Sequence, residues 1–230
     1  MKKFSLLLFV ALLLSSATQA QKISRFGGMG FFSFGLTDVK QPGLNTQLTA
    51  AGYTALQSNQ LSFGGEGFGI VNNFLIGGRG GGMGRQQFSN GTNTGTITNS
   101  YGSFLLGYTF PVGKKLLFYP LVGFGGIDSE LTIENSATTN NMGNALANPN
   151  QITVIKAEVP ILDFSLNFVV PVFGSVAGGG GPMLGITAGY MFSPAAGNYK
   201  MNGRDLINVP SGQINGFYVR MLFGGGGFGG

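Results

Sequence analysis

The sequence predicts an all-β fold: an eight-stranded, antiparallel, up-and-down transmembrane β-barrel behind a cleaved N-terminal signal peptide. Three observations lead to this prediction. Apolar residues alternate with small or polar residues along several segments, as in strands with one apolar face. Only 9% of the 230 residues are charged, against about 25% in a typical soluble domain. Long and short connections also alternate between the predicted strands, as they do in membrane barrels.

Residues 1–20 have the pattern of a secretory signal peptide. Lys2 and Lys3 form a basic start, residues 6–14 form an apolar core, and a small, polar exit follows. The apolar run reaches only about half of the ~20 residues that a membrane-spanning helix requires. We therefore expect export and cleavage of this segment, with residues 21–230 forming one barrel domain.

Eight segments show the alternation of strands. After the leader, no stretch has the roughly 18 uninterrupted apolar residues of a transmembrane helix. Each segment is long enough to cross a bilayer, which takes ~9–11 tilted residues. The segments lie near residues 25–35, 61–71, 74–88, 100–112, 116–134, 152–172, 182–193 and 213–224.

The connections between these segments alternate in length. The long, polar connections are residues 36–60, 89–99, 135–151 and 194–212. The short connections are residues 72–73, 113–115 and 173–181. In bacterial outer-membrane barrels the short turns face the periplasm and the long loops face outward. We therefore expect the chain in the outer membrane of a Gram-negative bacterium.

The first long connection contains a short helical pattern. Leu44, Leu48, Ala51 and Ala55 recur at helix-like spacing. We interpret this segment as a structural cap over the outer rim of the barrel.

The Asn72-Asn73 turn fixes a register for the second and third strands. In a two-residue hairpin Val71 faces Phe74, so Glu66 faces Arg79 on the same side of the sheet. That side must be the lumen, because an arginine facing lipid at mid-membrane costs about 2–4 kcal/mol. We predict an ion pair there, with a structural role favoured over a catalytic or ion-conducting one.

Alternate residues of a strand face the same side of the sheet, and this parity argument places further polar residues in the lumen. These residues are Arg85, Asp163, Asn167, Tyr218 and Arg220. An eight-stranded barrel leaves a bore that side chains fill, so a wide diffusion pore is not expected.

The fifth strand is apolar on both faces, so its orientation stays open. A two-residue turn at Gly113-Lys114 would direct Leu117, Tyr119 and Leu121 toward lipid, whereas a three-residue turn would direct Phe118, Val122 and Phe124 there.

Charged residues gather where the fifth and sixth strands would run past the membrane. These residues are Asp128, Glu130, Glu134, Lys156 and Glu158. A solvated strand tip is the preferred interpretation, and a site for a partner or a divalent cation is the alternative.

The composition excludes most catalytic chemistry. The chain has no histidine and no cysteine, so it has no histidine general base, no thiolate and no soft-metal site. We expect neither an enzyme nor a cofactor or metal. Without Lys2 and Lys3 the 13 basic residues fall to 11, against 8 acidic ones. This charge is too weak and too scattered for a nucleic-acid partner.

Two segments carry a resemblance to a known class. LSFGGEGFGIVNNFLIGG (residues 61–78) and YGSFLLGYTFPV (residues 101–112) resemble hairpins of small outer-membrane β-barrel proteins, in particular Bacteroidetes-type members of the eight-stranded class. The likeness covers residues 25–224 and transfers no functional residue. It implies outer-membrane lipid and the barrel-assembly machinery as partners.

The C-terminus departs from the pattern of that class. Its members end in an aromatic residue that the assembly machinery recognises, whereas Phe223 is followed here by GGGGFGG. The resemblance therefore implies either that Phe228 takes this part or that the signal is internal. The internal signal would consist of Gly216, Val219, Met221 and Phe223.

Three functions remain open at this stage. The first is a structural or surface-interaction barrel that contacts an envelope or extracellular protein through its four long loops. The second is a narrow, porin-like channel for small solutes or ions, with selectivity set by lumen charges. The third is a secreted Gly-rich β-protein, which would lack a continuous lipid-facing band.

Overall fold

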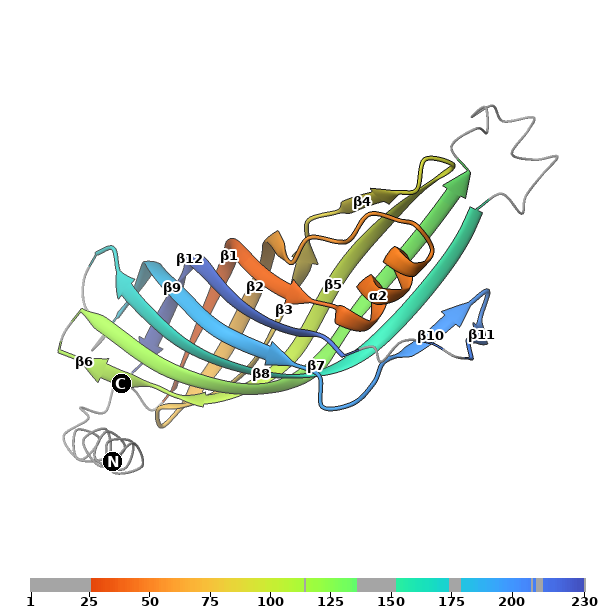
Figure 1. The fold of residues 1–230 in the computed structure, drawn as a ribbon. Helices are drawn as coiled ribbons and strands as arrows, with labels where there is room; N and C mark the ends of the chain where they lie inside the picture. Colours follow the sequence, from red (N-terminus) through yellow and green to blue (C-terminus); the bar gives the residue numbers. More distant parts are fainter. Residues whose placement is uncertain are drawn as a thin grey trace, which may run out of the picture.

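The computed structural model describes residues 26–113, 115–135, 152–173, 179–207, 209 and 213–229. Eight long antiparallel strands close into a barrel (Figure 1). Each strand pairs with the next along the chain, and the last pairs with the first. The predicted eight-stranded barrel is thereby confirmed. The strands are β1 (Phe26–Lys40), β2 (Asn59–Val71), β3 (Phe74–Met83), β5 (Asn93–Tyr108), β7 (Leu116–Asn135), β8 (Ile152–Pro171), β9 (Gly179–Phe192) and β12 (Asn215–Gly229).

Shorter elements extend this wall. β4 (Gln86–Ser89) pairs with β5, and β6 (Phe110–Val112) pairs with β7. β10 (Asn198–Met201) pairs with β8 and with β11 (Arg204–Asp205). The helix α2 (Pro42–Ala50) lies in the first long connection, where the sequence predicts a helical cap. The predicted signal peptide, residues 1–20, lies outside the described residues.

No helix within the described residues is long and apolar enough to cross a membrane.

The turns confirm the alternation of connection lengths. Asn72 and Asn73 have φ values of 48° and 72°, the left-handed geometry of a two-residue hairpin turn whose twist suits the flanking strands. Phe26 pairs with both Val71 and Gly229. The start of β1 and the end of β12 therefore lie at the end of the barrel that carries the short turns.

The next short turn settles the orientation of β7. Val112 pairs with Leu116, so three residues separate β6 from β7. Tyr119 is fully buried, while Val122 and Phe124 are exposed on the outer wall. Of the two orientations that the sequence leaves open, the three-residue turn therefore gives the correct one.

The placement of Arg85 in the lumen is wrong. The predicted strand over residues 74–88 is interrupted, because Gly84 and Arg85 lie between β3 and β4. Gly82 pairs with Ser100 of β5, whereas Gln86 pairs with Ile97, so the β3–β4 side contains one residue more than β5, as in a β-bulge. This single extra residue reverses the parity, and Met83 and Phe88 both point inward although one number is odd and the other even. Arg85 is exposed and donates a hydrogen bond to Thr96 Oγ1 at 3.3 Å.

The Gly-rich C-terminal segment continues β12. Gly224 to Gly229 pair with the first residues of β1, and most of them also pair with β9. Phe228 faces inward and is buried. The last strand is therefore longer than the predicted 213–224, and the first strand likewise continues to Lys40.

The two faces of the wall differ in composition. Large apolar residues cover the outer face, including Phe32, Phe63, Phe124, Leu166 and Phe217, each at least half exposed. Inward side chains form three buried apolar clusters. One cluster lies near the short turns, one lies toward the long loops, and the third packs Leu48 of α2 against Phe88, Ile97 and Leu131.

The wall is taller on one side than on the other. β5, β7 and β8 run past the ends of β1, β2 and β3, and α2 and β4 lie against this extension (Figure 1). On the outer face of β7, apolar residues give way to Asp128, Glu130, Thr132 and Glu134. The segment from Asp128 to Glu134 contains seven residues, which correspond to roughly 20 Å of strand beyond the apolar band.

Glycines facing the lumen allow the strands and the lumen side chains to approach closely. A Cβ atom on Gly125 would lie 1.9 Å from the Gly102 carbonyl oxygen of β5. A Cβ on Gly189 would lie 2.4 Å from the Tyr218 ring. Outward glycines differ, since a Cβ on Gly102 would meet no atom within 4 Å. The inward glycines are thus required by packing.

We expect Gly125→Ala to lower the free energy of unfolding by about 1–3 kcal/mol, because the added methyl group must push β7 away from β5. Gly102→Ala on the facing strand is the matched control and should stay within about 0.5 kcal/mol of the wild type. Urea unfolding of the refolded barrel measures both values. Equal losses for the two variants would show that the close approach at Gly125 is unimportant.

Candidate functional site

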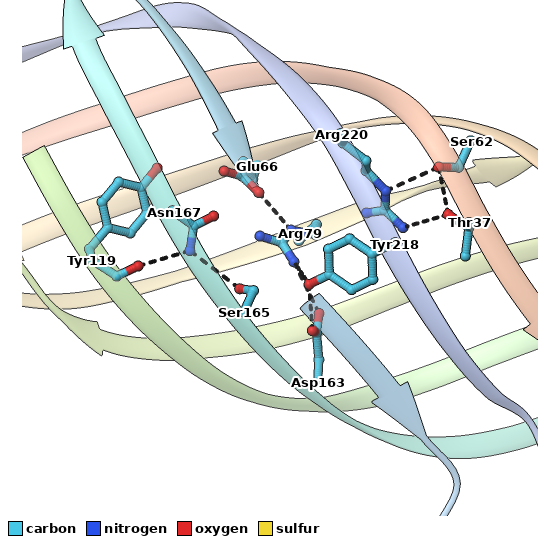
Figure 2. A network of polar contacts seen from close by, with 10 residues as sticks. All are labelled: Thr37, Ser62, Glu66, Arg79, Tyr119, Asp163, Ser165, Asn167, Tyr218 and Arg220. Carbon is cyan, nitrogen blue, oxygen red and sulfur yellow. Dashed lines mark hydrogen bonds and ion pairs between the residues drawn. The ribbon is translucent and has the colours of Figure 1, made fainter. Parts of the chain in front are cut away.

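The lumen contains a buried polar layer between its two larger apolar clusters, and this layer is the candidate site (Figure 2). Four charged residues are buried among the described residues: Glu66, Arg79, Asp163 and Arg220, each at most 6% exposed. They come from β2, β3, β8 and β12. Two of them are basic and two are acidic, so the formal charges of the layer cancel.

Glu66 and Arg79 stand directly opposite each other on β2 and β3. The Arg79 Nε donates to Glu66 Oε2 at 2.6 Å, and both side chains are inaccessible to solvent. The register is the one that the Asn72-Asn73 turn predicts, because a two-residue turn leaves no freedom in the pairing.

Arg79 also reaches across the lumen to β8 and β12. Its Nη1 atom donates to Asp163 Oδ2 at 3.2 Å and to the Tyr218 hydroxyl. The Tyr218 hydroxyl donates in turn to Asp163 Oδ1 at 2.6 Å. A single guanidinium therefore connects four strands, and it is balanced by two carboxylates that are not neighbours in the sheet.

Arg220 has a different environment. Its Nε donates to Ser62 Oγ at 3.1 Å and its Nη2 to Thr37 Oγ1 at 3.5 Å. The guanidinium carbon lies 4.5 Å from the centre of the Tyr101 ring and 4.3 Å from that of the Tyr218 ring. Two aromatic faces thus stabilise this buried cation by cation–π attraction.

Asn167 lies next to the ionic cluster. Its Nδ2 donates to the Tyr119 carbonyl oxygen at 3.0 Å and to Ser165 Oγ at 3.3 Å. Some polar atoms of the layer, including Glu66 Oε1, Arg79 Nη2 and Arg220 Nη1, have no hydrogen-bond partner among the described residues. Ordered water is expected to complete this network, because buried polar groups are costly to leave unpaired.

The polar layer brings together most of the residues that the parity argument placed in the lumen. Asp163, Asn167, Tyr218 and Arg220 are buried there beside the Glu66–Arg79 pair. The parity argument missed Thr37, Ser62 and Tyr101. Ser62 and Tyr101 lie on inward positions of predicted strands, so the same test would have found them if it had been applied to hydroxyl groups as well as to charges. Thr37 lies beyond the predicted end of the first strand at residue 35, so the test did not reach it.

The residues of the predicted assembly signal occupy both faces of β12. Val219, Met221 and Phe223 are exposed on the outer wall. Gly216 has the opposite parity and its backbone approaches Asp38 on β1. Recognition of this strand by the assembly machinery stays a prediction. Phe228, the alternative candidate, faces the lumen.

The predicted charged hairpin tip is formed by β7 and β8. Asp128 pairs with Glu158, and Glu130 pairs with Lys156, all on the outer face of the tall wall. Lys156 Nζ lies 3.1 Å from Glu130 Oε2, and both side chains are at least half exposed. The described residues contain no group of three or more carboxylate, histidine or cysteine side chains placed to hold a metal ion.

Fold and lumen together define the class: a closed eight-stranded antiparallel barrel whose bore is filled by side chains around a neutralised polar layer. No model of a known protein family matches the chain, and no curated protein matches it in sequence.

Solved structures of two outer-membrane proteins are similar in fold. Ail, the attachment invasion locus protein of Yersinia pestis, is 12% identical with a TM-score of 0.45, and the match covers 86% of this chain and 97% of that one. OprG from Pseudomonas aeruginosa is 14% identical with a TM-score of 0.48, covering 92% and 99%.

We expect Arg79→Met to lower the free energy of unfolding by about 3–5 kcal/mol, because it leaves Glu66 and Asp163 as buried charges without their cation. Arg85→Met is the control, since it removes an exposed arginine of the same hairpin, and it should cost less than about 0.5 kcal/mol. Urea titrations followed by the heat-dependent gel shift measure both variants.

If Arg79→Met does not fold, Glu66→Gln gives a milder test. It retains Asp163 as a partner for Arg79 and should cost about 1–3 kcal/mol. Stability equal to the wild type in Glu66→Gln, or in Arg79→Met where that variant folds, would contradict a stabilising role for the network.

Proposed function

We propose that the protein is a non-conducting outer-membrane barrel with a structural or surface-interaction role, which it performs through the tall part of its wall. The observation that carries this proposal is the filled lumen. Apolar side chains cluster on both sides of the ionic layer, and α2 packs over the loop end through Leu48. No catalytic role is proposed, because the chain has neither histidine nor cysteine.

The outer wall supports placement in a membrane. Near the short turns, the rings of Phe74, Tyr108, Phe110, Phe118 and Phe168 form a chain with successive centroids 5.0–6.0 Å apart. Aromatic residues gather in this way at the two borders of membrane barrels. Between this chain and the charged tip lies a band of aliphatic and aromatic side chains. A secreted Gly-rich protein would have no need of such a band.

The tall wall supports a role in surface contact. Beyond the apolar band, β4, β5, β7, β8, β10 and β11 form an open sheet whose outer face is polar. α2, Phe88 and Leu131 cover its inner face. A rigid sheet held above the bilayer can present side chains to an envelope or extracellular protein in a fixed geometry.

The channel alternative is tested by planar-bilayer conductance of the wild type and of Arg79→Gln. We expect no stepwise openings from the wild type, because the inward side chains block the path on both sides of the polar layer. Discrete openings whose ion selectivity changes in Arg79→Gln would support the channel and contradict the proposal.

The orientation can be tested with single cysteines, since the chain contains none. On intact cells, a membrane-impermeant maleimide should label Glu130→Cys on the tall wall, whose side chain is 50% exposed. Lys115→Cys, in an exposed short turn, should react only after the outer membrane has been permeabilised. The reverse labelling pattern, or recovery of the protein only in the soluble fraction, would disprove the proposed placement.

A further inference from the structure

The outer wall has an apolar groove centred on Ala188 of β9. It has a volume of about 470 Å³ and crosses β7, β8, β9 and β12. Ala188 pairs with Leu166 on one side and with Val219 on the other. Both neighbours carry larger side chains that are half exposed. The one-carbon side chain of Ala188 therefore forms the floor of a depression between two apolar walls.

Aromatic rings border the groove on the side of the long loops. On β9, the next outward-facing residue after Ala188 toward the long loops is Tyr190. It pairs with Phe164 of β8 and with Phe217 of β12. The Tyr190 and Phe217 ring centroids lie 4.5 Å apart, and Phe164 stacks on Phe192 at 6.0 Å. These rings form a continuous rim.

The rim marks the edge of the apolar band. Phe217 pairs with Asp38 of β1, and the Lys40 side chain, 67% exposed, follows on the same face. The groove therefore begins just inside the polar border at the loop end and opens into the lipid-facing surface.

We propose that this groove binds one acyl chain of lipopolysaccharide at a defined position. The surface around it contacts hydrocarbon, and an apolar depression left empty would forfeit dispersion contacts along both of its walls. Leu166 and Val219 stand two strands apart, about 10 Å between backbones, and their side chains narrow this gap over Ala188 to a slot suited to a single extended chain.

The position of the groove favours this lipid over the phospholipids of the inner leaflet. This step rests on the proposed function, which places the long loops outside. At that end of the barrel the surrounding leaflet consists of lipopolysaccharide. The Lys40 Nζ beyond the rim lies 3.9 Å from Asp38 Oδ2, but its side chain is 67% exposed, so it can turn from this weak pair to a headgroup phosphate at small cost.

The test compares two substitutions on the same face of β9. Ala188→Phe fills the groove, whereas Ile186→Phe adds a ring two residues away, outside the groove lining. The mature barrel and both variants are purified from outer membranes in mild detergent, exchanged into lipid-free micelles and titrated with lipopolysaccharide or phosphatidylethanolamine. Native mass spectrometry then counts the bound lipids.

We expect the wild type and Ile186→Phe to retain one lipopolysaccharide molecule. Ala188→Phe should bind it roughly tenfold more weakly, which corresponds to the loss of about two buried methylene groups. Equal binding by all three proteins, a preference for phosphatidylethanolamine, or a dimer that Ala188→Phe dissociates would each overturn the proposal. Fractionation and the heat-dependent gel shift, measured on the same preparations, show independently whether the outer-membrane barrel itself is correct.

Discussion

The structure depends on neutralising one buried cation in a narrow bore. Arg79 is buried on the inward face of the wall, and in an eight-stranded barrel the lumen is too narrow to hydrate it freely. Its guanidinium contacts Glu66 on the neighbouring strand and Asp163 on β8. Because Arg220 lies in the same layer, removing either carboxylate would leave one excess positive charge, and removing Arg79 would leave two carboxylates against Arg220 alone. Because the contacts reach β8 and β12 as well as β2, the network favours one relative position of these strands over shifted alternatives.

The apolar clusters on either side of this layer explain much of the unusual glycine content. A large side chain fits into the lumen only where a neighbouring strand contributes no side chain at the same level. Phe68 lies against Gly77, Phe88 against Gly95, and Tyr218 against Gly189. Curvature of the sheet alone would not place glycines beside the largest lumen residues. Filling the lumen therefore adds a second physical reason for glycine.

Strand parity and short turns were predictable from sequence because they are local properties. The two-residue turn at Asn72-Asn73 determines which residue faces Glu66, and the direction of side chains then follows with a period of two. The contacts of Arg79 with Asp163 and Tyr218 were not predictable. These strands are separated from β3 by long connections, which leave their relative register free, so parity shows that a residue points inward without showing which residue it meets.

The sequence predictions failed where the two-residue alternation of a strand is interrupted or where the sequence does not show the end of the strand. At the break formed by Gly84 and Arg85 the pairing with β5 shifts by one residue, and this reversal of parity is why Arg85 lies on the exposed surface and not in the predicted lumen. The segment after Phe223 lacks side chains that could show alternation, so a strand that continues to Gly229 could not be distinguished from a tail. In β7 both faces are apolar, and only the length of the preceding turn selects between them.

The distribution of polarity indicates where this barrel can act. In the lumen, the polar residues of the ionic layer are largely committed to one another: Glu66 and Asp163 to Arg79, Tyr218 to Asp163, and Arg220 to hydroxyl groups and aromatic rings. A ligand entering the lumen would have to break contacts that stabilise the fold. On the tall wall, by contrast, Asp128, Glu130, Lys156 and Glu158 are exposed, and the Lys156–Glu130 pair contributes little to stability at such exposure. The charges on the tall wall can exchange partners at small cost, whereas Arg79 cannot. The tall wall is therefore the part of the molecule that can bind another molecule without unfolding.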